Sequence, residues 1–216
     1  SFALTVLPPQ PGSARFASTT PMTIPFGPAS VYPSTINVSG MGGTITKLEL
    51  TISRLVHAYY DDVNMLLVGP TGVKCLFLSH SGGAGNSDLI TFTVSDSALF
   101  PFDGNFPIWS EIFRPTAYGS TPTFPPPAPG PPYTPIAFSS FNGLSANGAW
   151  KLYVYDDGTT DNGQITGGWS LLITTTGGSG TPSPTPTATA TSTPTATATF
   201  TPTATATFTP TATATF

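Results

Sequence analysis

The sequence predicts an all-β protein: an antiparallel, jelly-roll-like β-sandwich that is followed by an extended Thr/Pro-rich C-terminal tail. Short runs of β-branched and aromatic residues recur along the chain, and clusters of Gly, Pro, Asn and Asp separate them. No window offers three or four turns of apolar residues at helical spacing between capping residues. Because 216 residues are enough for one sandwich with appendages, we expect a single folded domain.

The alternation of apolar and polar residues that marks a half-buried strand is clearest in two runs. One extends from Leu48 to Ile52, and the other is Trp150-x-Leu152-x-Val154. Turn pairs such as Asn142-Gly143 stand between the runs and favour tight hairpins. Strands are expected at 35–38, 44–55, 63–68, 73–78, 89–94, 136–141, 149–155 and 164–174.

Changes in composition divide the chain into four parts. These are an irregular N-terminal arm at 1–20, the sandwich at 21–176, a Gly/Ser/Pro hinge at 177–184 and four octapeptide repeats at 185–216. An aromatic insert at 100–118 and a proline-rich insert at 121–135 interrupt the strands. Since proline lacks the N–H that a ladder needs, we expect the second insert to be a polyproline-like loop lying on its own domain.

The C-terminal repeats read TPTATATS once and TPTATATF three times. In an extended chain, such a segment carries threonine on one face and Pro, Ala and Phe on the other. A proline in every repeat permits pairing at a sheet edge but disfavours a central strand. A mucin-like stalk, a linker, an added strand and a polymer element all remain open. The candidate glycosylation sites are Thr185, Thr193, Thr201 and Thr209, and the candidate assembly residues are Phe200, Phe208 and Phe216.

Charge and cysteine content exclude several classes of protein. Charged residues make up 7% of the chain, the formal net charge is −4, and the basic residues are scattered, so no basic patch serves nucleic acid or an anionic membrane. No apolar run is long enough to span a membrane. The single Cys75 excludes an intrachain disulfide framework and is expected to be a small buried hydrophobic residue. The start at Ser1 fits a mature secreted protein and equally an internal fragment.

From about residue 21 to residue 174, the order of strands and short words resembles the P-domain (P/Homo B) family, in its bacterial secreted form. The words are IP at 24–25, INVSG at 36–40, HAYYDDVNMLLVGPTG at 57–72, SDSA at 95–98, FNG at 141–143, NGAWKL at 147–152 and WSL at 169–171. Val63, Ala149 and the proline-rich insert depart from the family pattern. The resemblance implies a jelly-roll-like sandwich without an active site. In the proprotein convertases such a module stabilises an adjacent subtilisin-like protease, and that protease is absent from these 216 residues.

Catalysis has little support in the residues themselves. A serine or cysteine nucleophile needs an adjacent base, and His57 and His80 are the chain's two histidines. No G-x-S-x-G elbow is present, and His57 is expected to be a hydrogen-bonded structural residue. Of the tryptophans, Trp150 and Trp169 are expected in the core, with Trp109 exposed.

The acidic, glycine-punctuated stretch at 156–163 is the best candidate for a metal site. Its ligands are all oxygen atoms, which suits Ca²⁺ rather than Zn²⁺, while an ordinary hairpin turn is the competing interpretation. The family resemblance places Asp61, Asp62 and Asp156 at positions associated with calcium. The candidate ligands are therefore Asp61, Asp62, Asp156, Asp157 and Asp161.

These observations predict a non-enzymatic, extracellular or cell-surface protein. The first hypothesis is a structural subunit of a filament or surface assembly, a homopolymer in which the O-glycosylated tail connects subunits. The alternative is an accessory P-domain that stabilises or targets a secreted subtilisin-like protease or other hydrolase, with the tail as a glycosylated linker. A carbohydrate-binding adhesion module is the third.

Overall fold

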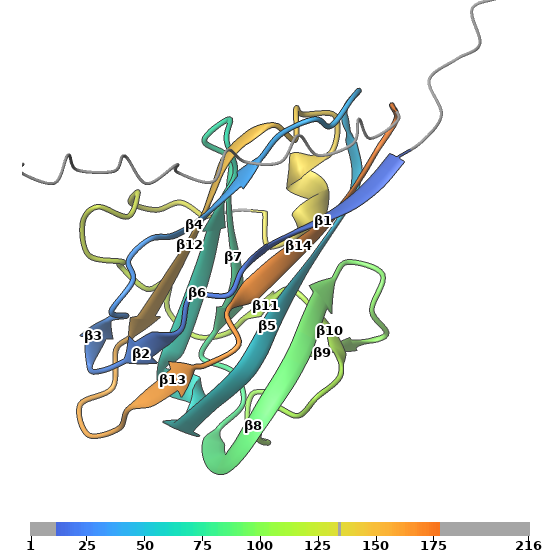
Figure 1. The fold of residues 1–216 in the computed structure, drawn as a ribbon. Helices are drawn as coiled ribbons and strands as arrows, with labels where there is room; N and C mark the ends of the chain where they lie inside the picture. The colour runs from blue at the N-terminus through green and yellow to red at the C-terminus, as the bar shows by residue number, and fades with distance from the viewer. Residues whose placement is uncertain (1–11, 134, 178–216) are drawn as a thin grey trace, which may run out of the picture. The chain divides into compact units, whose positions relative to one another are not determined.

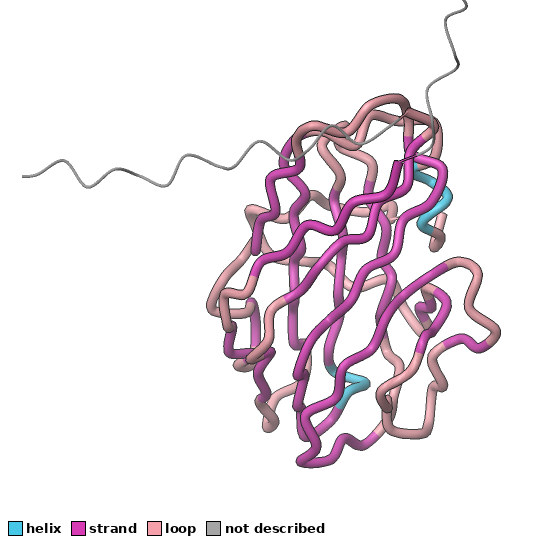
Figure 2. Tube along the Cα trace, turned by 45° about the vertical axis from the view of Figure 1, so that its right-hand side comes forward, coloured by secondary structure: helices cyan, strands magenta, loops and turns pink. Residues whose placement is uncertain are grey.

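The computed structural model describes residues 12–133 and 135–177. The chain divides into two units, Ser1–Ser183 and Pro184–Phe216, and all the described residues lie in the first. Two sheets pack face to face, as Figure 1 shows, and helical structure in residues 12–133 and 135–177 is confined to two short turns (Figure 2). The predicted all-β sandwich is therefore confirmed. No helix within the described ranges is long and apolar enough to cross a membrane.

The larger sheet, sheet A, has eight strands, and its long central strand β5 organises it. β13 pairs with β5 near the end of that strand, and β2 pairs with β13. In spatial order the remaining path is β1 (Gly12–Ser18), β14 (Trp169–Thr175), β5 (Ile45–Tyr59), β8 (Ala84–Ser95), β10 (Ile112–Arg114) and β9 (Phe100–Pro101), and the additional strands are β2 (Met22–Ile24) and β13 (Gly163–Ile165).

The smaller sheet, sheet B, has six strands, and both β3 and β4 pair with its central strand β12. Its strands are β11 (Thr116–Ala117), β7 (Lys74–Ser79), β6 (Val63–Val68), β12 (Gly148–Asp156), β3 (Gly27–Pro28) and β4 (Ser34–Val38). The long pairings in both sheets are antiparallel, whereas β10 with β8, β10 with β9, and β11 with β7 are short parallel pairs. Both sheets are thus mixed, because the aromatic insert contributes parallel edge strands.

Three sequence-based expectations differ from the structure. Residues 12–18, assigned to an irregular arm, form β1, which pairs with β14 along its whole length. The predicted strand at 164–174 divides into β13 and β14, with Gly168 at a φ of +71° between them. The predicted strand at 136–141 contains instead the 3₁₀ helix η2 (Phe138–Phe141), whose first backbone N–H groups donate to the Asp96 carboxylate.

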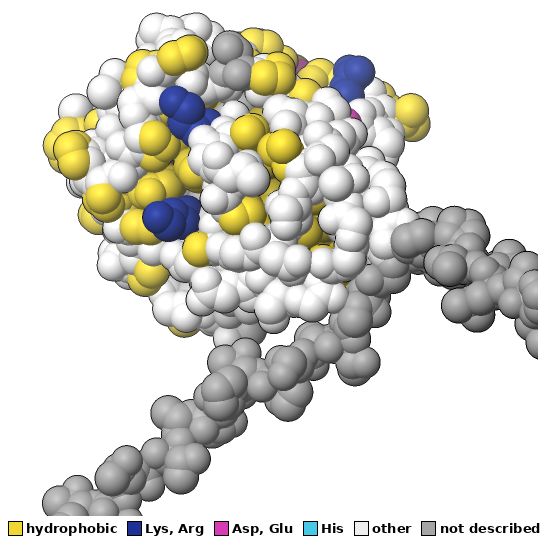
Figure 3. Space-filling view, turned by 90° about the horizontal axis from the view of Figure 1, so that it is seen from above, with side chains coloured by type: hydrophobic (Ala, Val, Ile, Leu, Met, Phe, Trp, Pro, Cys, Tyr) yellow, Lys and Arg dark blue, Asp and Glu magenta, His cyan; other side chains and the backbone are white. Residues whose placement is uncertain are grey.

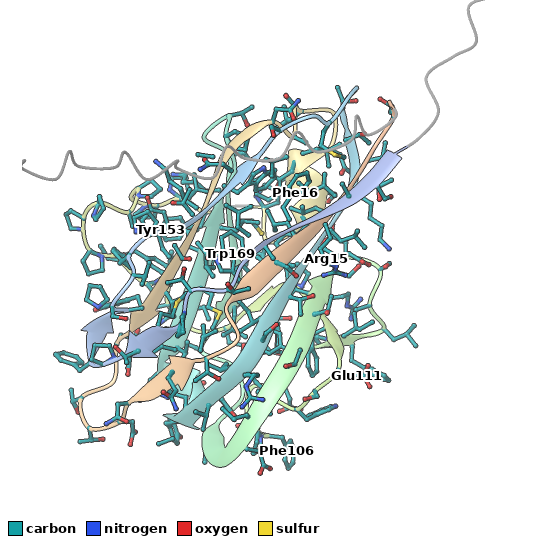
Figure 4. All side chains as sticks on the ribbon, in the orientation of Figure 1. Arg15, Phe16, Phe106, Glu111, Tyr153 and Trp169 are labelled. Atoms are coloured by element: carbon teal, nitrogen blue, oxygen red, sulfur yellow. The ribbon has the colours of Figure 1, made fainter. Side chains whose placement is uncertain are left out.

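The core between the sheets holds the aromatic side chains that the sequence assigns to it. Trp150 and Trp169 are buried, and their indole N–H groups donate to Ala146 O and Ser34 Oγ. Trp169 lies between the sheets in Figure 4, while Trp109 is 48% exposed. Cys75 is also buried, and burial raises the pKa of its thiol. These placements confirm the predicted roles of the tryptophans and the cysteine.

The proline-rich insert covers the outer face of sheet B. Leu66 and Tyr153 point away from the main core and pack with Phe124 and Tyr133 of the insert in a second apolar cluster. Tyr32 Oη donates to Pro125 O at 3.0 Å, so hydrogen bonding also holds the loop. The expectation of a proline loop lying on its own domain is confirmed. Sheet B is thus buried on both faces, by the main core on one side and by the insert on the other.

Charged side chains are sparse on the domain surface. On the face seen in Figure 3, Lys and Arg stand apart from one another among hydrophobic and uncharged polar groups. No basic patch is therefore present on this face.

Candidate functional site

Most of the predicted metal ligands come together at one end of the sandwich. Asp156 ends β12, and the following loop leads to β13, while Asp62 ends the 3₁₀ helix η1 (Tyr60–Asp62) between β5 and β6. The Asp157 N–H donates to Asp62 O at 3.0 Å, and a Cβ on Gly158 would lie against the Asp62 carboxylate. A residue without a side chain therefore allows the loop to approach η1 closely.

The electrostatics of this end show which carboxylates interact. Burial raises the pKa of Asp62, and repulsion from Asp156, Asp157 and Asp161 raises it further, while His57 acts in the opposite direction. Burial likewise raises the pKa of Asp157. Asp61 precedes Asp62 in η1, and its N–H donates to Gly83 O. Asp62 and the three loop carboxylates that raise its pKa, Asp156, Asp157 and Asp161, are called the acidic cluster.

His57 forms a fully buried pair with Asp156, a member of the acidic cluster. His57 Nε2 lies 3.1 Å from Asp156 Oδ2, and Nδ1 lies 2.7 Å from Tyr59 O. The second carboxylate oxygen, Asp156 Oδ1, accepts from the Gly158 N–H at 2.8 Å. Because both ring nitrogens face oxygen atoms and the side chain is inaccessible, His57 is a structural residue, as the sequence predicts.

The histidines contact acidic and main-chain groups in the described part of the chain. His80 Nε2 lies 3.9 Å from Asp157 Oδ2. Ser79, which precedes His80, is buried and donates to Asn64 Oδ1 at 2.6 Å. Within the described ranges, no serine, threonine or cysteine side chain is hydrogen bonded to either imidazole.

The fit to a calcium ion is incomplete. No group of three or more His, Cys, Asp or Glu side chains among the described residues is arranged to hold a metal ion. A protein calcium ion takes about six to eight oxygen ligands, so one bound here would depend largely on main-chain oxygens and water. The calcium site stays a prediction.

Sequence reasoning missed two polar residues that support the cluster. Asn64 Nδ2 donates to Asp62 O at 3.2 Å, and the Ser79 hydroxyl holds the amide oxygen of Asn64. Asn64 and Ser79 are both fully buried. The signal was a single amide inside the otherwise apolar run at 63–68, since a buried amide needs partners.

The predicted sites of the tail lie outside the described residues. They are the glycosylation sites Thr185, Thr193, Thr201 and Thr209 and the assembly residues Phe200, Phe208 and Phe216.

Comparison with known proteins gives partial similarities. No family model matches the chain. The leupeptin-inactivating enzyme 1 of Streptomyces exfoliatus is 31% identical over 90 residues, which cover 42% of this chain and 20% of the relative. The chain thus matches about a fifth of that enzyme's length.

Two solved structures of the Aeromonas sobria serine protease also match. The complex with a chaperone has a TM-score of 0.43 and 16% identity, and the protease structure has 0.42 and 15%. Each match covers 80% of this chain and 28% of the other. The P-domain assignment stays a prediction, because no family model supports it.

Proposed function

We propose that this chain is a non-catalytic accessory module of a larger secreted hydrolase, a β-sandwich that stabilises the neighbouring catalytic domain. The observation that carries the proposal is the state of His57: its ring is buried, and both nitrogens face oxygen atoms within the fold. The stretch of the Streptomyces enzyme that this chain matches is about a fifth of that enzyme's length, which supports a module within a longer protein. In this arrangement the Thr/Pro repeats serve as a linker.

The proposal reverses the order in which the sequence ranks its hypotheses. The filament hypothesis depended on the tail as connector, and the tail lies outside the described residues. The domain itself offers a buried core and a structural histidine rather than a catalytic arrangement.

The test isolates the native protein from its source with an antibody raised against the purified chain. We expect a longer secreted polypeptide that hydrolyses peptides, whereas the purified chain leaves peptides, leupeptin included, intact by mass spectrometry. Removing the module from that polypeptide should lower its midpoint of thermal inactivation. Hydrolysis by the chain alone, or a native polypeptide with no hydrolase domain, would refute the proposal.

One observation favours assembly as a second candidate function. β1 is an edge strand of seven residues, and among the described strands it pairs only with β14. The repeats contain proline-free stretches of the same length, for example 195–201, which a neighbouring copy could add at such an edge. Deleting residues 181–216 tests this candidate, because an unchanged particle size in solution would exclude it.

A further inference from the structure

A hollow of about 700 Å³ opens on sheet A where β2, β13, β5 and β8 meet. Its volume falls in the range of about 300–1,000 Å³ that is usual for small-molecule sites. Small residues keep it open, since Ala58, Gly85 and Gly163 line it. A Cβ on Gly85 would lie against the His57 carbonyl, and one on Gly163 against the Val56 carbonyl, so the packing beneath requires both glycines.

The lining of the hollow is polar but uncharged. Thr23, Asn162 and Gln164 are exposed and offer a hydroxyl and two amides, and no hydrogen bond to the described part of the chain engages these three side-chain groups. Pro25 and Val56 supply apolar surface between them. A phosphate or carboxylate ligand would lack a counter-charge here, and a purely apolar ligand would leave the amides unpaired. The lining therefore suits a neutral molecule that alternates hydroxyl groups with C–H surface.

Exposed aromatic residues directly follow two of the lining positions. Phe26, after Pro25, is 61% exposed, and Tyr59, after Ala58, is 40% exposed. Neither ring lines the hollow, and consecutive side chains of an extended strand point to opposite faces. The uncharged polar lining alone therefore favours a saccharide.

A peptide strand fits the hollow less well. At this end of sheet A, β5 already has a partner on each side, because His57 is in register with Gly163 of β13 and with Asn86 of β8. β5 therefore has no open ladder edge here. At the edge strand β2, the backbone N–H and carbonyl of Thr23 are already hydrogen bonded to Ser30, so recognition depends on side chains.

We propose that the hollow binds a neutral saccharide. This binding activity goes beyond the proposed accessory role and does not depend on it. It would attach the module to a polysaccharide surface whatever domain adjoins it.

The full chain is tested on an array of neutral oligosaccharides that includes cellohexaose, chitohexaose and maltohexaose, and the best probe is then titrated calorimetrically. We expect the double variant Asn162→Ala/Gln164→Ala to weaken binding at least tenfold. Ala58→Trp, which fills the hollow from a different strand, should abolish binding. Leu99→Ala is the matched control, since Leu99 is 82% exposed and does not line the hollow.

Circular dichroism and unfolding midpoints establish that each variant is folded before binding is compared. The proposal is overturned if no oligosaccharide binds the wild type more strongly than folded Ala58→Trp. It is also overturned if the double variant binds as the wild type does, or if peptides from a random library bind the hollow in place of any glycan.

Discussion

His57 of sheet A and Asp156 of sheet B meet at 3.1 Å between Nε2 and Oδ2, and both side chains are fully buried. The pair joins β5 to β12 across the interior, and Asp156 also belongs to the acidic cluster. Because water cannot reach either group, His57 Nε2 and Asp156 Oδ2 depend on each other for a polar partner. The pair therefore fixes the spacing of the sheets where β12 leads into the acidic loop.

Replacing His57 with Ala should reduce the free energy of unfolding by about 3–5 kcal/mol, the usual cost of removing one partner from a buried pair. The loss has two parts: a cavity in the core, and an Asp156 carboxylate whose remaining hydrogen-bond donor among the described residues is the Gly158 N–H. Urea unfolding followed by tryptophan fluorescence measures the change. A double-mutant cycle with Asp156→Ala isolates the pair from the cavity.

His80→Asn is the matched control for this experiment. His80 faces Asp157 at 3.9 Å, both side chains are partly exposed, and asparagine tolerates the positive φ of 46° at this position. We expect a loss below about 1 kcal/mol. Equal losses in the two histidine variants would show that burial of the His57 pair has no special importance.

Asp62→Asn should stabilise the protein at neutral pH, by roughly 0.5 kcal/mol because solvent screens the partly exposed cluster. The pKa of Asp62 is raised by burial and then by Asp156, Asp157 and Asp161, so the folded state holds this proton more tightly than the unfolded state. Ionised Asp62 therefore lowers the free energy of unfolding. This loss is absent below the ordinary aspartate pKa of about 3.9 and grows as the pH rises above it.

Thermal unfolding of wild type and Asp62→Asn from pH 3 to pH 8 measures this dependence. The two midpoints should converge at the acid end and separate toward neutral pH, with a smaller separation in high salt. A constant difference across the range would mean that ionisation of Asp62 is not the cause.

The sequence patterns predicted strands best where a run lies in the middle of a sheet. The strand at 63–68 was placed at its observed bounds, because β6 is apolar on both faces, with the core on one side and the proline loop on the other. β1 was missed because it is an edge strand whose inward Ala14 and Phe16 are only partly buried, which leaves a weak alternation. The apolar run that contains Phe138 and Phe141 resembles a strand in sequence. The two residues are three positions apart, however, and one turn of a 3₁₀ helix directs both side chains into the core.

The candidate site was predictable only in part for a related reason. The aspartates of the loop at 156–163 are neighbours in sequence, so composition alone grouped them. The partner of His57 lies 99 residues away along the chain, and no local pattern could identify it. The hollow on sheet A depends on the small side chain of Ala58 and on the missing one at Gly85, and it forms only when four strands are assembled.

Calcium should raise the midpoint of chelator-treated protein if the predicted site exists, because a divalent cation relieves the repulsion among Asp62, Asp156 and Asp157. At about ten times the dissociation constant, linkage gives a gain of roughly 1.4 kcal/mol. That gain corresponds to a shift of about 3–5 °C for a domain of this size. Differential scanning calorimetry with chelator and with added CaCl₂ measures it, and Asp62→Asn should diminish the shift. An unchanged midpoint in the wild type removes calcium from the description of this loop.

Phe124→Ala should loosen the proline-rich loop and destabilise the domain. Phe124 is 3% exposed, its ring packs against Tyr133 and Tyr155, and it anchors the cluster that covers sheet B. Truncating a buried Phe costs about 3–5 kcal/mol, and a loop that can partly collapse into the space places the loss at the lower end. Phe106→Ala is the matched control, since Phe106 is 66% exposed, and its effect should stay within about 0.5 kcal/mol.

Urea unfolding gives both values, and limited proteolysis should cut Phe124→Ala faster than the wild type within 121–135. If both phenylalanine variants unfold at the same urea concentration as the wild type, the loop rests on sheet B without stabilising it.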